Sequence, residues 1–140
     1  MDDGVTGTHV SANRDAFGRV RSIAGSSDDR PVLMLNLNSY SEAAGFPDGE
    51  AYTSYMGHLD HAVAAAGGRV LWRSPTLDVV IGCEHDAYDE ILAVWYPSHA
   101  AFVALPEADG ADAMFERRRV CVEHATILSL PGDRDPLRPV

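Results

Sequence analysis

The sequence predicts an α+β domain whose elements follow the order strand, helix, strand, strand, helix, strand. Residues 31–40 (PVLMLNLNSY) and 88–102 (YDEILAVWYPSHAAF) each have the pattern of a buried strand that runs into a polar or helix-capping segment. Between them, a segment with helical spacing ends in GGRVLW at residues 67–72. A β-α-β unit repeated once in this way gives the ferredoxin-like fold, a four-stranded antiparallel sheet with its helices on one face.

The first predicted strand covers residues 32–38, and alternation gives it two different faces. Asn36 and Asn38 lie on one face, where a buried amide needs a hydrogen-bonding partner. They are therefore candidate ligand-binding residues, unless neighbouring backbone groups satisfy them. The other face carries only leucine, and we expect it to lie beneath the helices. It consists of Leu33, Leu35 and Leu37.

The first helix is predicted over residues 49–66, because apolar residues recur there at helical spacing. The glycine pair at 67–68 ends it, since glycine readily adopts the left-handed conformation that follows many helices. The second strand then comes in two pieces, 69–73 and 77–82, separated by a Ser-Pro pair. The buried stripe of the helix is predicted to be Tyr52, Tyr55, Met56, Leu59, Val63 and Ala66.

The third strand is predicted over residues 88–96, where a proline stops it. Ser98 can then cap a short helix that ends at Leu105. A second helix over residues 112–123 and a last strand over 125–130 complete the domain.

The predicted domain spans residues 31–131, between an N-terminal extension and a short C-terminal tail at 132–140. The extension, residues 1–30, is expected to be flexible or partly helical, and deleting residues 1–12 is expected to cost under about 1 kcal/mol. The chain shows no membrane-length apolar run and no secretory signal pattern. We therefore expect a cytoplasmic protein.

Composition and charge argue against several classes of function. The 140 residues include 21 acidic and 11 basic ones, and a net charge of −10 repels nucleic acids and anionic membranes. The chain has no lysine, so it cannot form a Schiff base. No phosphate-binding loop, dinucleotide fingerprint or convergent set of metal ligands is visible. We predict no cofactor, no metal, no nucleic acid partner and no membrane partner.

The third strand predicts a homodimer, because it is apolar on both of its faces. Helices can cover only one face of the sheet in this fold, and an exposed apolar face needs a cover. Packing two sheets face to face around a two-fold axis is the usual solution, and it leaves a cavity in each half. The chain is therefore expected to pair with itself.

Several segments of the chain also match the pattern of a known family. These are MLNL (34–37), Tyr52, Tyr55, GGRVLW (67–72), VIG (80–82), YDEILAVWYPSHAAF (88–102) and Arg119. In them the chain resembles the uncharacterised domain-of-unknown-function family thirteen-thirty, of the dimeric α/β-barrel superfamily, over residues 31–130. The resemblance implies a ferredoxin-like homodimer. It implies no activity, because most members have none assigned.

Three residues are candidates for proton transfer. His99 follows the predicted helix cap, where the helix dipole favours the neutral imidazole that a general base requires. Glu90 interrupts an apolar strand, so its carboxylate points either into a cavity or to the sheet edge. His58 lies at the edge of the buried stripe of the first helix. Each of them also has a purely structural interpretation, as a solvated or core residue.

The candidate substrate-binding residues are polar groups on apolar strands and the aromatic residues beside them. The aromatic residues fit either a core or the flat walls of a pocket for an aromatic ligand. Arg119 matches the family pattern and is expected to point back to the sheet, where it could pair with Glu90. The full set is Asn36, Asn38, Tyr55, Trp72, Trp95, Tyr96 and Arg119.

These features predict a small cofactor-independent enzyme that acts on a hydrophobic, aromatic or polyketide-like molecule of secondary metabolism. Similar dimeric barrels host cyclases, isomerases and oxygenases, an analogy at the level of the fold. Proton transfer by a cyclase or isomerase is the first hypothesis, and a cofactor-free monooxygenase is the second. A small-molecule-binding accessory protein without turnover is the third.

Overall fold

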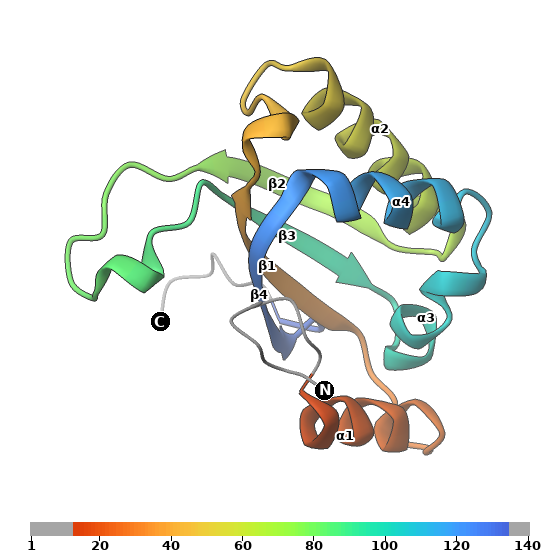
Figure 1. Cartoon of the computed structure of the whole chain (residues 1–140). Helices are drawn as coiled ribbons and strands as arrows, with labels where there is room; N and C mark the ends of the chain where they lie inside the picture. The colour runs from red at the N-terminus through yellow and green to blue at the C-terminus, as the bar shows by residue number, and fades with distance from the viewer. Residues whose placement is uncertain (1–12, 135–140) are drawn as a thin grey trace.

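A computed structural model describes residues 13–134 of the chain (Figure 1). Residues 1–12, whose deletion is predicted to cost little, lie outside the described residues. So does the end of the C-terminal tail. The elements in chain order are α1 (Arg14–Ala24), β1 (Val32–Tyr40), η1 (Glu42–Ala44), α2 (Glu50–Ala65), β2 (Arg69–Pro75), η2 (Glu84–Asp86), β3 (Glu90–Tyr96), α3 (His99–Val103), η3 (Leu105–Glu107), α4 (Ala111–Cys121) and β4 (Val122–Pro131).

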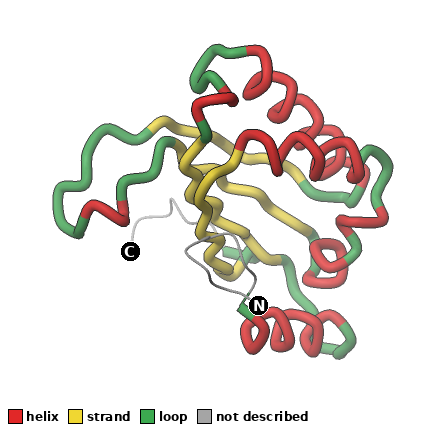
Figure 2. The backbone as a smooth tube through the Cα atoms, in the orientation of Figure 1, coloured by secondary structure: helices red, strands yellow, loops and turns green. Residues whose placement is uncertain are grey.

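The four strands form one antiparallel sheet in the order β2-β3-β1-β4. In the register of the two central strands, Val32 lies opposite Tyr96 and Asn38 lies opposite Glu90. This strand order, with the helices between strands, confirms the predicted α+β, ferredoxin-like fold. Figure 2 shows the sheet as one layer, with α2 and α4 side by side on one side of it.

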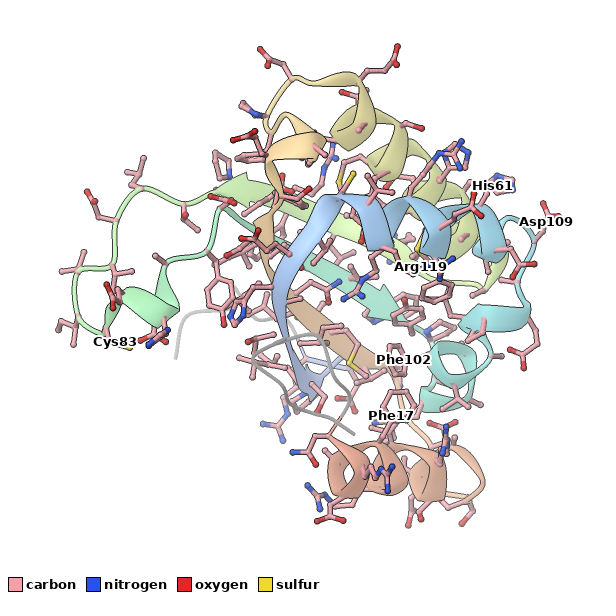
Figure 3. All side chains as sticks on the ribbon, in the orientation of Figure 1. Phe17, His61, Cys83, Phe102, Asp109 and Arg119 are labelled. Carbon is pink, nitrogen blue, oxygen red and sulfur yellow. The ribbon has the colours of Figure 1, made fainter. Side chains whose placement is uncertain are left out.

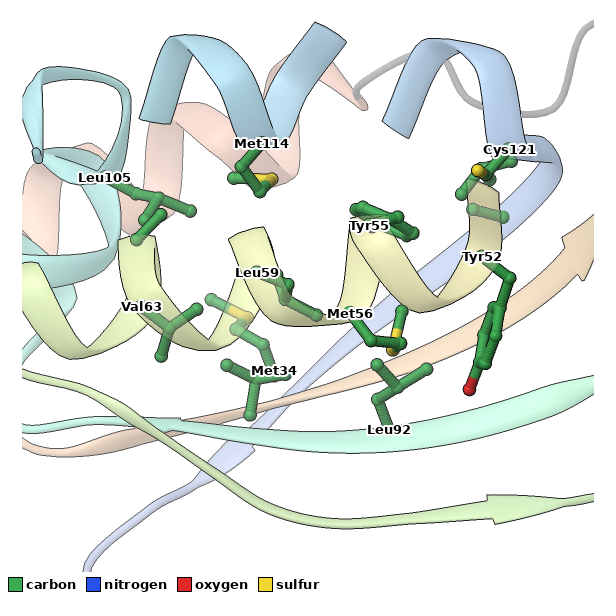
Figure 4. Packing of buried hydrophobic residues seen from close by; sticks show 14 of the residues in the cluster. Met34, Tyr52, Tyr55, Met56, Leu59, Val63, Leu92, Leu105, Met114 and Cys121 are labelled. Carbon is green, nitrogen blue, oxygen red and sulfur yellow. The ribbon is translucent and has the colours of Figure 1, made fainter. Parts of the chain in front are cut away.

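Helix α2 forms the centre of the core and packs on the sheet (Figure 4). Its buried residues are those of the predicted stripe except Ala66, which is half-buried, and Ala62 joins them. Helix α4 packs against α2 and contributes Met114 and Cys121 to the same core. The core residues from α2 are Tyr52, Tyr55, Met56, Leu59, Ala62 and Val63.

The prediction of which face of β1 lies beneath the helices was wrong. Val32, Met34 and Tyr40 belong to the helix-side core, whereas Leu35 and Leu37 are only half-buried and face away from it. Both faces of β1 are apolar, so alternation separates the two sets but cannot say which one the helices cover. We call the side with Met34 the helix face and the side with the leucines the open face.

The second piece of the predicted second strand, 77–82, is not a strand. Strand β2 ends at Pro75, which has no N–H to extend a ladder, and a projecting loop follows (Figure 1). The third strand begins at Glu90, two residues later than predicted, and α3 ends at Val103. The last strand begins at Val122, three residues earlier than predicted.

The predicted short helix in the N-terminal extension is present as α1. Asn13 caps it, since its Oδ1 accepts a hydrogen bond from the Ala16 N–H at 3.1 Å. No residue of α1 is fully buried, and the helix packs on α3 at one end of the sheet (Figure 1). Among residues 13–134, no helix has both the length and the apolar character that crossing a membrane requires.

Candidate functional site

The most specific polar arrangement joins the segment before β1 to the start of α3. One carboxylate oxygen of Asp29, Oδ1, accepts a hydrogen bond from the His99 backbone N–H at 2.6 Å. The other, Oδ2, accepts from the Ala100 N–H at 3.1 Å. The His99 ring adds two contacts through Nδ1, to Asp29 Oδ1 at 3.0 Å and to the Arg30 carbonyl oxygen at 2.9 Å. Both side chains are only 14% exposed.

These contacts define the tautomer of a neutral His99. A carbonyl oxygen and an ionised carboxylate can only accept hydrogen bonds, so Nδ1 must carry the hydrogen. The other ring nitrogen, Nε2, then holds the lone pair. A carboxylate that orients a histidine through one nitrogen and leaves the other free to accept a proton is the usual arrangement for a general base.

Asp29 is ionised at neutral pH. Burial alone would raise the pKa of its carboxyl group, but hydrogen bonds from the backbone N–H groups of His99 and Ala100 and the contact with the His99 ring together lower the pKa below its ordinary value of 3.8. Sequence reasoning identified His99 and missed Asp29. The sequence shows Asp29 only as part of an Asp-Asp pair just before the first strand. The residue that Asp29 contacts, His99, is 70 residues away.

An aromatic wall lies on the same side of the molecule. His99 and Phe102 are three residues apart on α3, a spacing that places them on one face of the helix. The Phe102 ring contacts Phe17 of α1 at 5.8 Å between centroids and Tyr96 of β3 at 5.3 Å. Figure 3 shows Phe17 and Phe102 pointing toward one another between α1 and α3. Tyr96 therefore packs against a ring of the helix that carries His99, and the sequence did not reveal this aromatic wall.

Tyr96 is a buried core residue, and Tyr55 lies near it. Burial raises the pKa of Tyr96, and nearby Tyr55 raises it further. Burial likewise raises the pKa of Tyr55, although the neighbouring Arg118 guanidinium offsets part of this effect. Both phenols are therefore neutral across the physiological pH range, and each can donate a hydrogen bond.

Glu90 forms a second polar centre at the other end of β3. Its carboxylate is buried, with 4% of the residue exposed, and its oxygens Oε1 and Oε2 accept hydrogen bonds from Tyr40 and Tyr52, each at 2.6 Å. Asn38 donates to the Tyr40 hydroxyl at 3.3 Å. The Tyr40, Tyr52 and Phe46 rings surround the carboxylate with mutual contacts of 4.9–5.1 Å.

This centre is separate from His99. Glu90 and Tyr96 are the first and last residues of β3, so roughly 20 Å of strand separates the two centres. Burial raises the pKa of Tyr40, and the hydrogen bond to Glu90 raises it further; the same causes raise the pKa of Tyr52. Glu90 therefore holds two neutral phenols in place, and both of its oxygens are engaged. Its expected partner, Arg119, is not among these contacts.

The remaining predicted residues are spread over both sides of the sheet. Asn36 lies on the helix face, and its Oδ1 is buried without a partner among the described residues. His58 donates from Nδ1 to the Ser54 carbonyl oxygen at 2.8 Å, one turn earlier in α2. Arg119 is exposed on α4 (Figure 3). Trp72 and Trp95 lie on the open face, away from His99 and Glu90.

The open face of the sheet is mostly apolar and carries polar contacts at its two ends. Trp95 donates from Nε1 to the Gly132 carbonyl at 2.9 Å, and the Arg69 guanidinium lies 5.2 Å from its ring centre. At the other end of this face the Tyr88 hydroxyl lies 2.5 Å from Thr126 Oγ1 and 3.1 Å from His124 Nε2. The apolar residues of the open face are Leu33, Leu35, Leu37, Trp72, Ile91, Ala93, Trp95, Leu128 and Leu130.

No metal centre is visible in the part of the chain that the structure describes, because no three His, Cys, Asp or Glu side chains converge there. A shallow groove runs between the outer sides of α2 and α4, lined by Ser54, Arg117 and five neighbours. It contains none of the predicted site residues. The chemistry is thus best sought at the Asp29–His99 pair.

Solved structures of a protein named RPA0582 are similar to this chain. The chain matches a crystal structure of RPA0582, a protein of unknown function from Rhodopseudomonas palustris, with a TM-score of 0.72 and 27% sequence identity, over 94% of this chain and 99% of that one. Methylated RPA0582 matches with a TM-score of 0.73 and 26% identity, over 95% and 100%. No family model matches the sequence, and no curated protein does. The resemblance to family thirteen-thirty therefore stays a prediction.

Proposed function

We propose that this protein is a small cofactor-independent enzyme, a cyclase or isomerase that moves a proton on a hydrophobic, aromatic or polyketide-like molecule. The observation that carries the proposal is the Asp29–His99 pair, in which an ionised carboxylate holds Nδ1–H of a largely buried imidazole. A histidine held in this way offers Nε2 as the base.

The substrate would lie against the aromatic wall of Phe17, Phe102 and Tyr96. Flat rings bind an aromatic or fused-ring molecule without needing a charged partner. Removing a proton next to a carbonyl group leaves negative charge on the carbonyl oxygen, and a neutral phenol such as Tyr96 can donate a hydrogen bond to it. The unpartnered Oδ1 of Asn36 can accept a hydrogen bond from a substrate hydroxyl.

The working form would be a homodimer that packs the open faces of two sheets together. Trp72 and Leu128 on this face are 41% and 48% exposed, and most of their neighbours on it are half-buried or buried and apolar. A face of this kind is costly to leave in water. A second copy of the same face is its simplest cover, because a two-fold axis makes one patch complementary to itself.

The experiment measures hydrogen exchange, because the natural substrate does not need to be known. The full-length protein is incubated in D₂O with aryl ketones and β-diketones, and NMR follows deuterium entering the carbon next to the carbonyl. Replacing a general base typically lowers the rate by about 10² to 10⁴. We expect His99→Gln to slow exchange by this factor, and Asp29→Asn to slow it less.

The matched control is His61→Gln. His61 also pairs with an aspartate, Asp109, at 2.8 Å, but that pair is exposed and lies on the outside of α2. Its loss should leave the exchange rate unchanged. Equal exchange rates for the normal chain and the His99→Gln variant would show that His99 is not the base. Binding of a ketone without any exchange would indicate a binding protein without turnover.

A further inference from the structure

The loop between β2 and β3 is an ordered arm that extends away from the body of the protein (Figure 1). We call residues 76–87 the arm. At its base, the Thr76 N–H donates to the Asp89 carbonyl at 3.0 Å, and the Ser39 hydroxyl donates to the Ala87 carbonyl at 3.3 Å. At its tip, the Cys83 N–H donates to Asp86 Oδ2 at 3.0 Å. The arm therefore has a defined shape without contacts to the core.

The apolar side chains of the arm are exposed. Leu77 is 96% exposed, Val80 89% and Ile81 95%. A single exposed leucine is ordinary, but three in five residues on a projecting arm form an interaction surface. Leu71 and Trp72 of the adjoining strand are 42% and 41% exposed, so the strand that leads into the arm also exposes large apolar side chains.

The charges of the arm indicate what its partner is. The arm carries Asp78, Glu84 and Asp86 and no arginine. A chain with net charge −10 offers few positive surfaces, but α1 carries Arg14, Arg19 and Arg21 against one acid, Asp15. Helix α1 also has apolar area to cover, since none of its residues is fully buried and Ile23 is 36% exposed.

The arm cannot reach the α1 of its own chain. The arm leaves the sheet beside Ser39, whereas α1 leads into Val32 at the other end of β1. That strand spans roughly 30 Å, and Figure 1 shows the two segments pointing away from each other. A second copy turned end for end about a two-fold axis would place each arm at the end of the sheet where the other copy's α1 lies, and the contact would be made twice.

We propose that the arm of one copy docks on α1 of a second copy, with its leucine and isoleucine side chains against the helix and its acids beside the α1 arginines. The contact adds to the face-to-face packing of the sheets proposed above and rests on that dimer. It also places the partner's arm next to the aromatic wall, because Phe17 of α1 contacts Phe102 there. The second copy thereby completes the wall against which the substrate lies.

Cysteine cross-linking tests the contact. It measures whether two residues of different copies lie close together, and it does not depend on activity. Cys83 is a free, exposed thiol at the tip of the arm, and Cys121 is buried. Ser22→Cys places a thiol on the exposed surface of α1. We expect mild oxidation of this variant to give a disulfide-linked species of twice the chain mass, and adding Cys83→Ser to abolish it. Ala64→Cys, exposed on α2, is the matched control and should give none.

A charge reversal provides the second readout. Asp78→Arg should raise the dimer dissociation constant about tenfold or more, and Arg19→Asp in the same chain should restore much of the loss. Cross-linking that survives Cys83→Ser, or that Ala64→Cys gives equally, would overturn the proposal. So would a dimer whose strength does not change with Asp78→Arg. If the arm variants left the dimer dissociation constant unchanged while the protein still catalysed exchange that depends on His99, the arm contact alone would be excluded. The proposed function would stand.

Discussion

At the scale of single residues, the fold makes two different uses of carboxylates that interrupt apolar surroundings. Glu90 is enclosed by two phenols and holds the end of the core together. Asp29 is less enclosed, is ionised, and orients an imidazole whose other nitrogen is free to accept a proton. Sequence reasoning pointed to Glu90 and His99 as polar residues in unusual places. It could not tell which of them is satisfied, because their partners are 38 to 70 residues away.

Asp29→Ala is expected to lower the free energy of unfolding at pH 7 by about 1–3 kcal/mol, because the ionised carboxylate accepts hydrogen bonds at the start of α3. The pKa of Asp29 is lowered in the folded protein, so this contribution is complete above its ordinary pKa of 3.8. It is lost as the pH falls from there through the folded-state value. Urea unfolding at pH 7 and at pH 2 measures the change.

The control for this prediction is Asp28→Ala, the exposed neighbouring carboxylate. It should change the unfolding free energy by less than about 0.5 kcal/mol at both pH values. A loss of stability in Asp29→Ala that is as large at pH 2 as at pH 7 would contradict a role for the charged carboxylate.

Tyr52→Phe is expected to cost about 1–3 kcal/mol, because it leaves one oxygen of the buried Glu90 carboxylate without its donor. Glu90→Gln keeps the shape of the side chain but replaces one acceptor oxygen by an NH₂ group, so it should also be destabilising. Thermal or urea unfolding measures both. Since Glu90 lies far from His99, neither variant should slow exchange in folded protein. A slowed exchange in either would return Glu90 to the list of candidate bases.

At the scale of elements, most of the fold could be predicted from local patterns. The helical stripe of α2, the glycines that follow it and the caps at Asn13 and Ser98 all involve residues within a few positions of one another. The choice of helix face and open face could not be predicted in the same way. Both sides of β1 are apolar, and only contacts with distant helices decide between them.

The arm shows a second limit of local patterns. Its sequence LDVVIG, residues 77–82, has the composition of a buried strand and therefore predicts one. The structure instead leaves it unpaired after Pro75, with its apolar side chains in solvent. An apolar pattern reports that a segment needs cover. It does not say whether the cover comes from the same chain or from another one.

A pair of glycine substitutions tests the close approach between Gly68, after α2, and β3. At Gly68 an added Cβ would lie 2.5 Å from the Trp95 carbonyl oxygen, so Gly68→Ala must push β2 away from β3. At Gly57, inside α2, an added Cβ meets nothing within 4 Å. We expect Gly68→Ala to cost about 2 kcal/mol or more and Gly57→Ala to gain about 0.5–1 kcal/mol. Urea unfolding of the two variants side by side checks both signs, and a neutral Gly68→Ala would contradict the close approach.

At the scale of the whole molecule, the helix face of the sheet is covered within one copy, whereas the open face is not. Two layers of helix and sheet bury the helix face completely enough to form a core. The open face and the arm keep large apolar side chains in contact with water in a single copy. A strongly acidic chain resists nonspecific association, so a cover for these surfaces has to be specific. Self-association through matched surfaces satisfies both conditions.

Assembly into a dimer is the claim on which the covered face, the arm contact and the completed substrate wall all rest. Sedimentation velocity of the full-length chain at micromolar concentration tests it most directly. The expected result is one species of twice the 15.1 kDa chain mass, which Leu35→Arg on the open face shifts toward the monomer and Thr53→Arg on the exposed side of α2 does not. A stable 15.1 kDa species at that concentration would contradict the claim.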